Sequence, residues 1–422
     1  MKISIFPSWV LGHRLWFLVF ALSLALLGAW SKFYIQDRNY RTDQELSISK
    51  RLPSKGPDDP PVLAYWVFGS YGESRKILRL LKAIYHPRNQ YLLQLDAEAS
   101  DYERSNLAIS VQSERVFRAF GNVNVVGRSY ALNQMGASVL AATLHAAALL
   151  LKISADWDWF ITLSSSDYPL MTQDDVLHAF SLLPRDLNFV NYTTSTEWKK
   201  QHNTNQIVVD PSLHLKTNSP IFYAVETRET PEAFQVFGGS PWMILSRAFM
   251  EHCVNGWEDN LPRKLLMYFS NVAFPLESYF HTVLCNSPQF QNTTVNNDLR
   301  YINWDTTKGE PAVLSMSNYD EIVSSEAVFV RPFKEDDPVL QELDDKVLNR
   351  KPNWVLPGKW CINQGMNMSM DSSKAAEEDL CSTWGDINLV RPGSHGMKLG
   401  KFLSKLVADK RLVPNHCHSS ET

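Results

Sequence analysis

The sequence predicts an α/β fold with a largely parallel sheet, placed behind an N-terminal membrane anchor. Two observations predict the fold. From residue 62 onward, short apolar stretches of strand character alternate with stretches of helical spacing. These strands are apolar throughout, as expected when both faces of a sheet are covered. The anchor is predicted from an uncharged apolar run near the N-terminus, followed by a polar, Pro-containing stretch.

The composition is that of a folded chain. The 422 residues carry 41 basic and 45 acidic side chains, a formal charge of −4, and 44% of them are hydrophobic. Such a chain can form one large domain or two smaller ones. It has no excess of positive charge of the kind that nucleic-acid binding requires, so we expect no nucleic-acid partner.

Residues 15–35 are predicted to form a transmembrane signal anchor. The stretch LWFLVFALSLALLGAW carries no charge and lies between Arg14 and Lys32. It is shorter than the ~20 residues that a span needs, and apolar residues on both sides extend it. A cleaved signal peptide is the competing interpretation, but Leu27 stands where its cleavage site needs a small residue. We expect residues 1–14 in the cytosol and the rest in a lumen.

Residues 36–61 are predicted to be a stem. They are rich in charge, Ser and Pro and end PSKGPDDPP, a composition that cannot bury a core and favours a flexible spacer. A folded domain over 62–351 and a C-terminal extension over 352–422 follow. N-glycosylation sequons begin at three positions, which favours a lumenal location: Asn191, Asn292 and Asn367.

The five cysteines lack the CxxC spacing of a zinc site. In an oxidising lumen we expect Cys361–Cys381 and Cys253–Cys285 as disulfides, with Cys417 left over.

The first half of the domain is predicted as strand–helix units. VLAYWVF is a buried strand, a GSYGES turn follows it, and SRKILRLLKAIYH has apolar residues at helical spacing before PRN breaks the helix. The Ala- and Leu-rich run at 136–152 is too short to prefer a membrane and is expected as a core helix. The elements predicted in order are strand 62–68, helix 74–86, strand 90–96, helix 105–117, strand 123–126, helix 136–152, strand 159–163, helix 173–182 and strand 188–190.

The second half is less regular. The polar stretch 201–231 predicts loops with short strands. Helices are predicted over 247–253, over 276–284 just after Pro275, over 338–348 behind capping aspartates, and over 398–408 as an amphipathic helix.

Ligands bind at the carboxyl ends of strands in such sheets. That rule selects Gly69–Glu73, Asp96 and Ser164–Asp167. The last segment contains one carboxylate, Asp167, after three serines, so it lacks the Asp-x-Asp pair that would hold a divalent cation. Asp156-Trp157-Asp158 has that spacing but precedes its strand, at the wrong end. We therefore predict no metal and no cofactor.

Two further features suggest chemistry. Glu277 lies at an expected helix start, where a carboxylate can face a cleft as a general base, although the helix dipole also favours an acid there. Arg331 and Lys334 form a basic turn that would stabilise an anionic group, and a charged surface turn is the competing interpretation.

Several long motifs resemble the Core-2/I-branching glycosyltransferases, glycosyltransferase family 14. The likeness is greatest to its plant branch, the β-glucuronosyltransferases that act on arabinogalactan proteins. It covers about residues 61 to 351 and is carried, in order, by AYWVFGSYGES, YHPRNQYLLQLDAEA, TLHAAALLL, DWDWFITLSSSDYPLMTQDD, FGGSPWMILSRAF, ESYFHTVLCNS, LRYINWD and FVRPFKEDDPVL.

The resemblance implies a GT-A-type (Rossmann-like) domain, a UDP-sugar donor, inversion at the anomeric carbon and no metal. It implies a single-pass type II protein of the Golgi membrane that transfers glucuronate from UDP-glucuronate to β-galactan. Glu277 becomes the catalytic base. The expected donor-binding residues are Val67, Asp96, Asp167, Arg331 and Lys334. The expected acceptor-binding residues are Trp304, Glu197 and Lys199.

Two departures from the family pattern fall on the donor side. Pro332 stands where the plant pattern FARKF has a Lys, for which Lys334 or Arg300 would have to substitute, and Gln134 replaces a Tyr. They leave two alternatives open: transfer of N-acetylglucosamine or xylose by the same fold, and a Golgi-anchored, non-catalytic glycan-binding or assisting protein. Assembly into homo-oligomers, or with other glycosyltransferases, is also left open.

Overall fold

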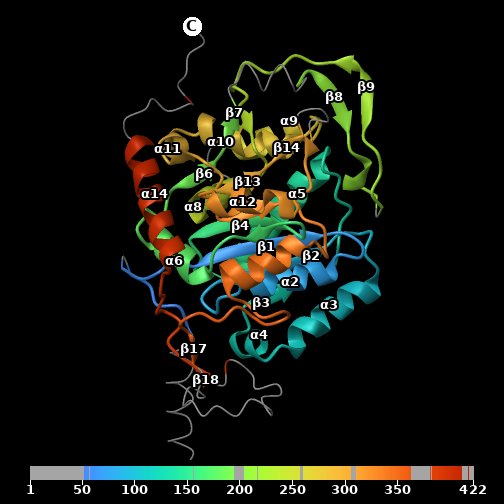
Figure 1. Ribbon diagram of the computed structural model, residues 1–422. Helices are drawn as coiled ribbons and strands as arrows, with labels where there is room; N and C mark the ends of the chain where they lie inside the picture. The colour runs from blue at the N-terminus through green and yellow to red at the C-terminus, as the bar shows by residue number, and fades with distance from the viewer. Residues whose placement is uncertain are drawn as a thin grey trace, which may run out of the picture. The chain divides into compact units, whose positions relative to one another are not determined.

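The structure is a computed structural model that describes residues 52–56, 58–154, 156–193, 204–215, 217–256, 260–305, 310–362, 381, 383–410 and 417. Within them, seven strands form a central sheet in the order β12-β6-β11-β4-β1-β2-β3 (Figure 1). The bounds are β1 Leu63–Gly69, β2 Gln90–Leu95, β3 Val123–Val125, β4 Trp159–Ser164, β6 Asn188–Val190, β11 Ile244–Ser246 and β12 Thr294–Asn296.

The neighbouring strands of this sheet run parallel, except for β11, which is antiparallel to both β4 and β6. The largely parallel α/β sheet predicted from the sequence is thus confirmed. The predicted strands that became β1, β2 and β4 each lie within one residue of their expected ends. Short apolar runs between turn residues locate buried strands well, because little else can bury such a run.

Helices cover both faces of the sheet (Figure 1). Tyr65 and Val67 of β1 belong to one buried cluster, with α2, α3, α6 and α14, while Trp66 and Phe68 belong to the other, with α5, α8, α9 and α10. The helices are α2 Ser74–Ile84, α3 Asp101–Ser113, α4 Arg115–Phe120, α5 Ala137–Ile153, α6 Gln173–Ser181, α8 Arg247–Asn255, α9 Leu261–Phe269, α10 Tyr279–Asn286, α11 Pro288–Gln291, α12 Tyr319–Ser324, α13 Pro338–Glu342 and α14 Ser394–Lys410.

Local capping explains where one predicted helix differs from the observed one and where another begins as expected. The helix expected over 105–117 begins earlier, because the Ser100 side chain accepts a hydrogen bond from the Glu103 backbone N–H. It is also interrupted at Glu114, whose backbone is extended, so it becomes α3 and α4. At α6, Thr172 and Asp175 form a capping box.

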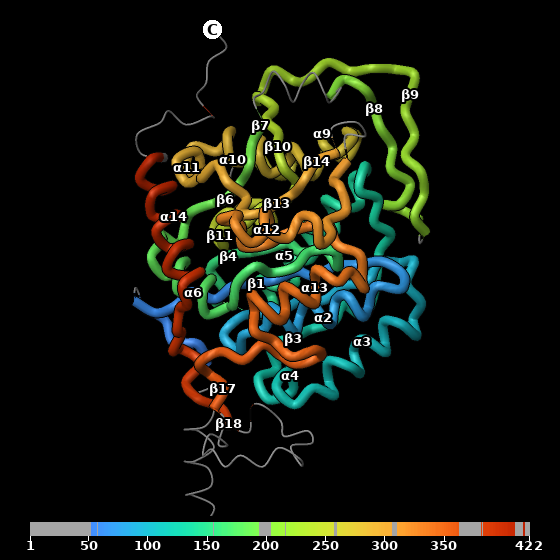
Figure 2. The backbone as a smooth tube through the Cα atoms, viewed as in Figure 1, coloured from blue at the N-terminus to red at the C-terminus, as the bar shows by residue number. Residues whose placement is uncertain are grey.

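Smaller strand pairs lie outside the central sheet. β13, β16 and β5 form a three-stranded sheet, and β8 pairs with β9 at the periphery (Figure 2), where Val208 of β8 is hydrogen-bonded to Asn271. The bounds are β5 Tyr168–Pro169, β7 Tyr192–Thr193, β8 Gln206–Val209, β9 Phe222–Thr227, β10 Gly238–Gly239, β13 Arg300–Ile302, β14 Trp304–Asp305, β15 Glu310–Pro311, β16 Phe329–Arg331, β17 Cys361–Ile362 and β18 Thr383–Trp384. Within the described ranges, 3-10 and π-helical segments connect these elements: η1 Pro211–Leu213, η2 Pro275–Glu277, η3 Met316–Asn318 and the π-helical η4 Leu343–Leu348.

The described part of the C-terminal extension packs onto the domain. α14 lies along α6 (Figure 1), and the Asp175 carboxylate of α6 accepts hydrogen bonds from the backbone of Gly393 and Gly396. Its neighbour Asp174 accepts from the backbone of Lys359 and Arg391. Two adjacent aspartates in the first turn of α6 thus hold the extension against that helix.

The end of the predicted stem is likewise fixed to the domain. The buried Arg88 guanidinium donates to the carbonyl oxygens of Pro60 (2.9 Å) and Ser54 (2.6 Å), and Arg185 donates to that of Asp59 (2.7 Å). We predicted a flexible spacer as far as Pro61. That prediction is wrong for these residues, because charged donors satisfy their backbone carbonyls.

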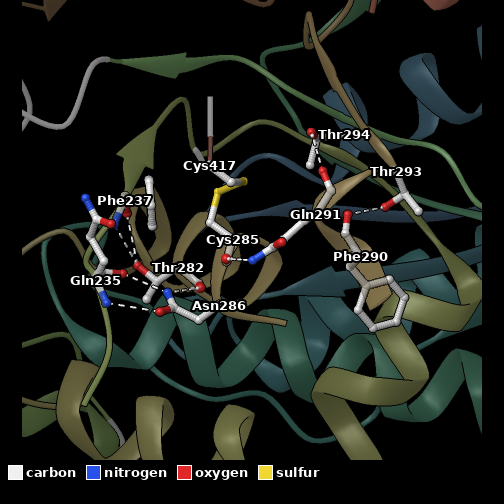
Figure 3. Close-up of a disulfide and its surroundings, with 10 residues drawn as sticks. All are labelled: Gln235, Phe237, Thr282, Cys285, Asn286, Phe290, Gln291, Thr293, Thr294 and Cys417. Carbon is white, nitrogen blue, oxygen red and sulfur yellow. Dashed lines mark hydrogen bonds between the residues drawn. A yellow bond between two sulfur atoms is a disulfide. The ribbon is translucent and has the colours of Figure 1, made fainter. Parts of the chain in front are cut away.

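One predicted disulfide is confirmed and one is wrong. Cys361 and Cys381 are bonded, as expected. Cys285, at the end of α10, is bonded to Cys417 instead of Cys253 (Figure 3). Cys253 is a free thiol, because α8 directs it into the core, where only 7% of it is exposed.

In the part of the chain that the structure describes, no helix has the length and apolarity to cross a membrane. The predicted anchor, 15–35, lies outside these residues, as does the sequon residue Asn367. The sequon residues Asn191 and Asn292 are both exposed.

Candidate active site

The carboxyl ends of β1, β2 and β4 lie side by side, as the predicted ligand edge requires. Gly69 is paired with Leu95 of β2, and its neighbour Phe68 with Ser164 of β4. A tight turn follows β1, in which Glu73 accepts a hydrogen bond from the Ser70 backbone (2.8 Å). The loops after these three strands therefore form one edge of the sheet, where small ligands bind in folds of this class.

Asp96 ends β2 at this edge and is held by three donors. Its carboxylate accepts from the Ser70 hydroxyl (3.0 Å), the Glu98 backbone (3.0 Å) and the Asn218 amide (3.4 Å). Burial raises the pKa of Asp96 above its ordinary value, and the Ser70 hydrogen bond opposes that shift. Asn218 comes from the loop between β8 and β9, so a segment remote in sequence contacts Asp96, the acid predicted to bind the donor.

Val67 does not lie at a ligand surface. Its side chain is fully buried in the hydrophobic core, and its backbone is paired with both β2 and β4. The strand continues to Gly69, two residues further than Val67, before the chain reaches the edge. Ser70 is therefore the residue after β1 that faces the predicted site.

Asp167 lies in a short buried network with two arginines. It accepts from the backbone (2.7 Å) and hydroxyl (2.5 Å) of Ser164 and from Nη1 of Arg300 (2.9 Å). The side chains of Asp167 and Arg300 are fully buried, and Arg300 also donates to the Thr162 carbonyl. Arg300 thus neutralises the single carboxylate of this loop.

Arg331 is the second arginine beside Asp167, and the buried Asp298 lies next to Arg300, so two aspartates face the two arginines. Its Nε lies 3.7 Å from Asp167, and its guanidinium carbon lies 3.9 Å from the centre of the Trp242 ring. Burial lowers the pKa of Arg331 and Asp167 opposes the shift; an arginine remains charged in either case. Among the described residues the Arg331 Nε is buried without a hydrogen-bond partner, and 16% of the side chain remains exposed.

Glu277 is half-buried and lies in η2, the 3-10 turn before α10. The expected helix over 276–284 is therefore wrong at its start, since α10 begins two residues beyond the carboxylate. Phe274, with a left-handed backbone (φ 51°), donates its N–H to the Met135 carbonyl (2.9 Å) and so fixes the turn.

His281 connects the Glu277 segment to the arginine network. It is fully buried on α10, and its Nε2 lies 3.0 Å from the Ser240 carbonyl oxygen. Burial lowers the pKa of His281 to about 4, so the ring is neutral at pH 7 and is a weak base. Ser240 also accepts from the Trp242 backbone, and Trp242 lies under Arg331.

The remaining predicted residues are dispersed. Trp304 is 56% exposed on β14, as an acceptor contact would require. Lys334 is exposed and lines a cavity that Asp167 also lines and Trp242 does not. Glu197 and Lys199 lie outside the described residues.

Sequence reasoning missed Trp242 and Asn218. Trp242 lies within the motif FGGSPWMILSRAF, but nothing in its spacing shows that Arg331 stacks on it. Asn218 lies in a polar loop with no distinguishing pattern.

No group of three or more His, Cys, Asp or Glu side chains able to hold a metal ion occurs in the described ranges. The absence of a metal requirement stays a prediction.

The fold and site together define a class. The carboxyl edge of the sheet carries Asp96 after β2 and, after β4, Asp167 with its two arginines, while Glu277 lies in η2. A carboxylate that can accept a proton and arginines that can bind an anion are what a group-transfer enzyme with an anionic leaving group requires.

The comparisons identify the family. The family model for the Core-2/I-branching enzymes matches residues 63–324, and the chain belongs to this family of glycosyltransferases. β-Glucuronosyltransferase GlcAT14A of Arabidopsis thaliana is 42% identical over 402 residues, covering 95% of this chain and 86% of that protein. GlcAT14C of the same plant is 48% identical over 290 residues, covering 69% and 75%. Human xylosyltransferase 1 is 32% identical over 256 residues, covering 60% and 25%.

Proposed function

We propose that the protein is an inverting, metal-independent β-glucuronosyltransferase with a GT-A-type domain. It would transfer glucuronate from UDP-glucuronate to β-galactan side chains of arabinogalactan proteins. The names of the plant relatives support the sugar. The observation that carries the chemistry is Arg331: a charged guanidinium on Trp242, beside an aspartate that Arg300 already neutralises.

Glu277 is the proposed base. Its carboxylate takes the proton from an acceptor hydroxyl, whose oxygen forms a bond to the anomeric carbon. The bond from that carbon to the diphosphate breaks on the opposite face, and UDP leaves with the electron pair. This single displacement inverts the configuration, and it needs one base on the acceptor side and positive charge on the leaving side.

Arg331 is the proposed source of that positive charge. In a site shielded from water, an arginine that is not matched by a carboxylate stabilises a diphosphate strongly. Had Asp167 been free, its negative charge would have cancelled the benefit or required a metal. Arg300 removes that need by pairing with Asp167.

Asp96 and Trp304 are proposed as donor and acceptor contacts. Asp96, on the donor side, would accept from the uracil, with its orientation fixed by Ser70 and Asn218. Trp304 would stack on an acceptor sugar ring, which its exposed side chain allows.

The proposed location is the Golgi lumen, behind a type II anchor at 15–35. Two disulfides support an oxidising compartment, since such bonds do not persist in a reducing cytosol. The exposed sequon residues Asn191 and Asn292 support the same side of the membrane.

Xylosyl transfer is the second candidate, and the identity to human xylosyltransferase 1 favours it over other sugars. The test is a donor screen. The full-length chain in detergent is incubated with each UDP-sugar and a β-galactan acceptor, and UDP release and the glycan product are measured. Transfer from UDP-glucuronate alone supports the proposal, and transfer from UDP-xylose replaces the donor. No transfer by folded protein would favour a glycan-binding or assisting role, in line with Pro332 and Gln134.

A further inference from the structure

A second cavity lies next to the catalytic region. It has a volume of about 470 Å³ and is bounded by α2, the loop between β4 and β5, and the segment from residue 333 through α13 and η4. Figure 2 shows α13 in front of α2, and a hydrogen bond from Arg79 to Asp344 joins α2 to η4. The volume is within the range of small-molecule sites.

The floor of this cavity carries a buried excess of positive charge. Arg350 and Arg79 both bind the Asp344 carboxylate, at 2.7 and 2.8 Å, and the side chains of Arg350 and Asp344 are each 1% exposed. The Tyr168 hydroxyl donates to the same carboxylate (2.6 Å). Two guanidinium groups therefore share one carboxylate, which leaves a net charge of +1 where screening is weak.

Arg79 lines the cavity and keeps one guanidinium nitrogen without a partner among the described residues. Its Nε donates to the Tyr168 hydroxyl and its Nη2 to Asp344. Within the described part of the chain its Nη1 has no partner, although the side chain is 29% exposed and lines the cavity. A guanidinium with one edge free is suited to bind an oxyanion.

The rim contains charges of both signs. Arg75 and Lys334 are exposed and, among the described residues, form no ion pair, and the acidic Glu335 and Asp336 also line the cavity. Lys76 and Lys82 also line the cavity, but each is paired with a glutamate outside it. The two basic and two acidic side chains of the rim balance, and solvent screens them. The sign of the electrostatic potential in the cavity therefore depends on the buried floor.

The cavity is distinct from the reacting centre, although the two share a boundary. Glu277, Asp96, Arg331 and Trp242 do not line it, whereas two of the predicted donor-binding residues, Asp167 and Lys334, do. Asp167 is already neutralised by Arg300 from the other side.

We propose that this cavity binds the phosphate or carboxylate group of an anionic ligand. Two sources have this chemistry here: a free nucleoside diphosphate, and a uronate on an acidic glycan. Either would place its oxyanion against Arg79, with Arg75 at the entrance and the buried Arg350 contributing charge from below.

The test is calorimetric titration of the full-length chain in detergent. The probes are UDP, inorganic phosphate and a glucuronate-bearing galactan oligosaccharide, with the neutral oligosaccharide as a reference. Arg75→Ala changes an exposed side chain at the cavity, and Arg118→Ala, an exposed arginine on α4, is the matched control. Arg79→Gln, verified by its melting temperature, removes one cation of the floor.

We expect at least one anion to bind about tenfold more weakly to the Arg75 and Arg79 variants, with no change in the Arg118 variant. Weaker binding of UDP and phosphate assigns the site to a phosphate, and weaker binding of the acidic oligosaccharide assigns it to a uronate. Unchanged affinity of both cavity variants for all three probes would overturn the proposal. Binding is measured without turnover, so the result does not depend on which sugar the enzyme transfers.

Discussion

At the scale of single residues, the site depends on how charges are matched rather than on how many there are. Asp167 stands where a metal-dependent enzyme would need a second carboxylate, and Arg300 neutralises it. Arg331 then has no full partner and stacks on Trp242. Pro332 stands where the family pattern has a lysine, so Arg331 is the cation that remains for the leaving group.

Glu277→Gln should abolish transfer while leaving donor binding intact. Glutamine keeps the size of the side chain but cannot accept the acceptor's proton, so turnover should fall about 10²- to 10⁴-fold. The measurement is the rate of UDP-sugar consumption, with donor affinity by titration. Glu251→Gln, a half-exposed acid on α8, is the control. Near-normal turnover of the Glu277 variant would exclude it as the base.

His281 should make the protein less stable in acid. Its folded pKa of about 4 is below the ordinary value of 6.5, so below pH 6.5 the unfolded chain binds a proton that the folded chain does not. This contribution is complete above about pH 6.5 and is lost as the pH falls to 4, by about 3 kcal/mol.

The measurement is the free energy of unfolding from pH 7 to pH 4, compared between the native chain and His281→Asn. The native chain should lose more stability than the variant over this range. His214→Asn, at an exposed position, should keep the native slope. Equal slopes for the native chain and His281→Asn would contradict the assignment.

At the scale of elements, the sequence predicted those strands and helices that their own residues determine. Apolar runs and turn residues identified β1, β2, β4 and α5 closely. α9 was missed although Leu265, Tyr268 and Phe269 bury one helical face behind Pro262, which shows that its pattern was available. β11 is three residues long, and only its pairing with β4 and β6 makes it a strand.

The candidate site was predictable in part for the same reason. Strand ends and an acid beside Pro275 are local features, and they gave Asp96, Asp167 and Glu277. Trp242 and Asn218 enter the site through contacts with residues far away in sequence, which no spacing rule encodes. Val67 was placed two residues too early, because the strand extends beyond it to Gly69.

The two disulfides should differ in their contribution to stability. A bond limits the unfolded chain more when it closes a longer loop, and the separations are 132 residues for Cys285–Cys417 and 20 for Cys361–Cys381. Chain entropy gives about 5 and about 3 kcal/mol. Cys417→Ser should therefore lower the melting temperature more than Cys381→Ser. The reverse order would show that native packing, and not loop length, governs their effect.

At the scale of the whole molecule, one sheet organises everything that the structure describes from Pro53 onward. The predicted extension is fastened to α6 by Asp174 and Asp175, and the end of the predicted stem by Arg88. The sequence did not indicate either attachment, since both are backbone hydrogen bonds accepted or donated by distant side chains.

Activity should survive chelation. If Arg331 stabilises the leaving diphosphate and Arg300 neutralises Asp167, excess EDTA should leave the rate of transfer unchanged within about twofold. The measurement is UDP release before and after chelation, with re-addition of Mn²⁺. A complete loss that Mn²⁺ restores would instead assign a metal to Asp156 or Asp167.

The Cys285–Cys417 bond has a consequence for how the protein is made. At ~5–20 residues per second, Cys417 is synthesised roughly 7 to 26 seconds after Cys285. During that interval the nearest earlier thiol is Cys253, the partner that sequence order alone suggests. Burial of Cys253 on α8 before Cys417 is synthesised would prevent a Cys253–Cys285 bond and leave Cys285 free for Cys417. In the finished protein, the burial of Cys253 keeps its thiol away from Cys285.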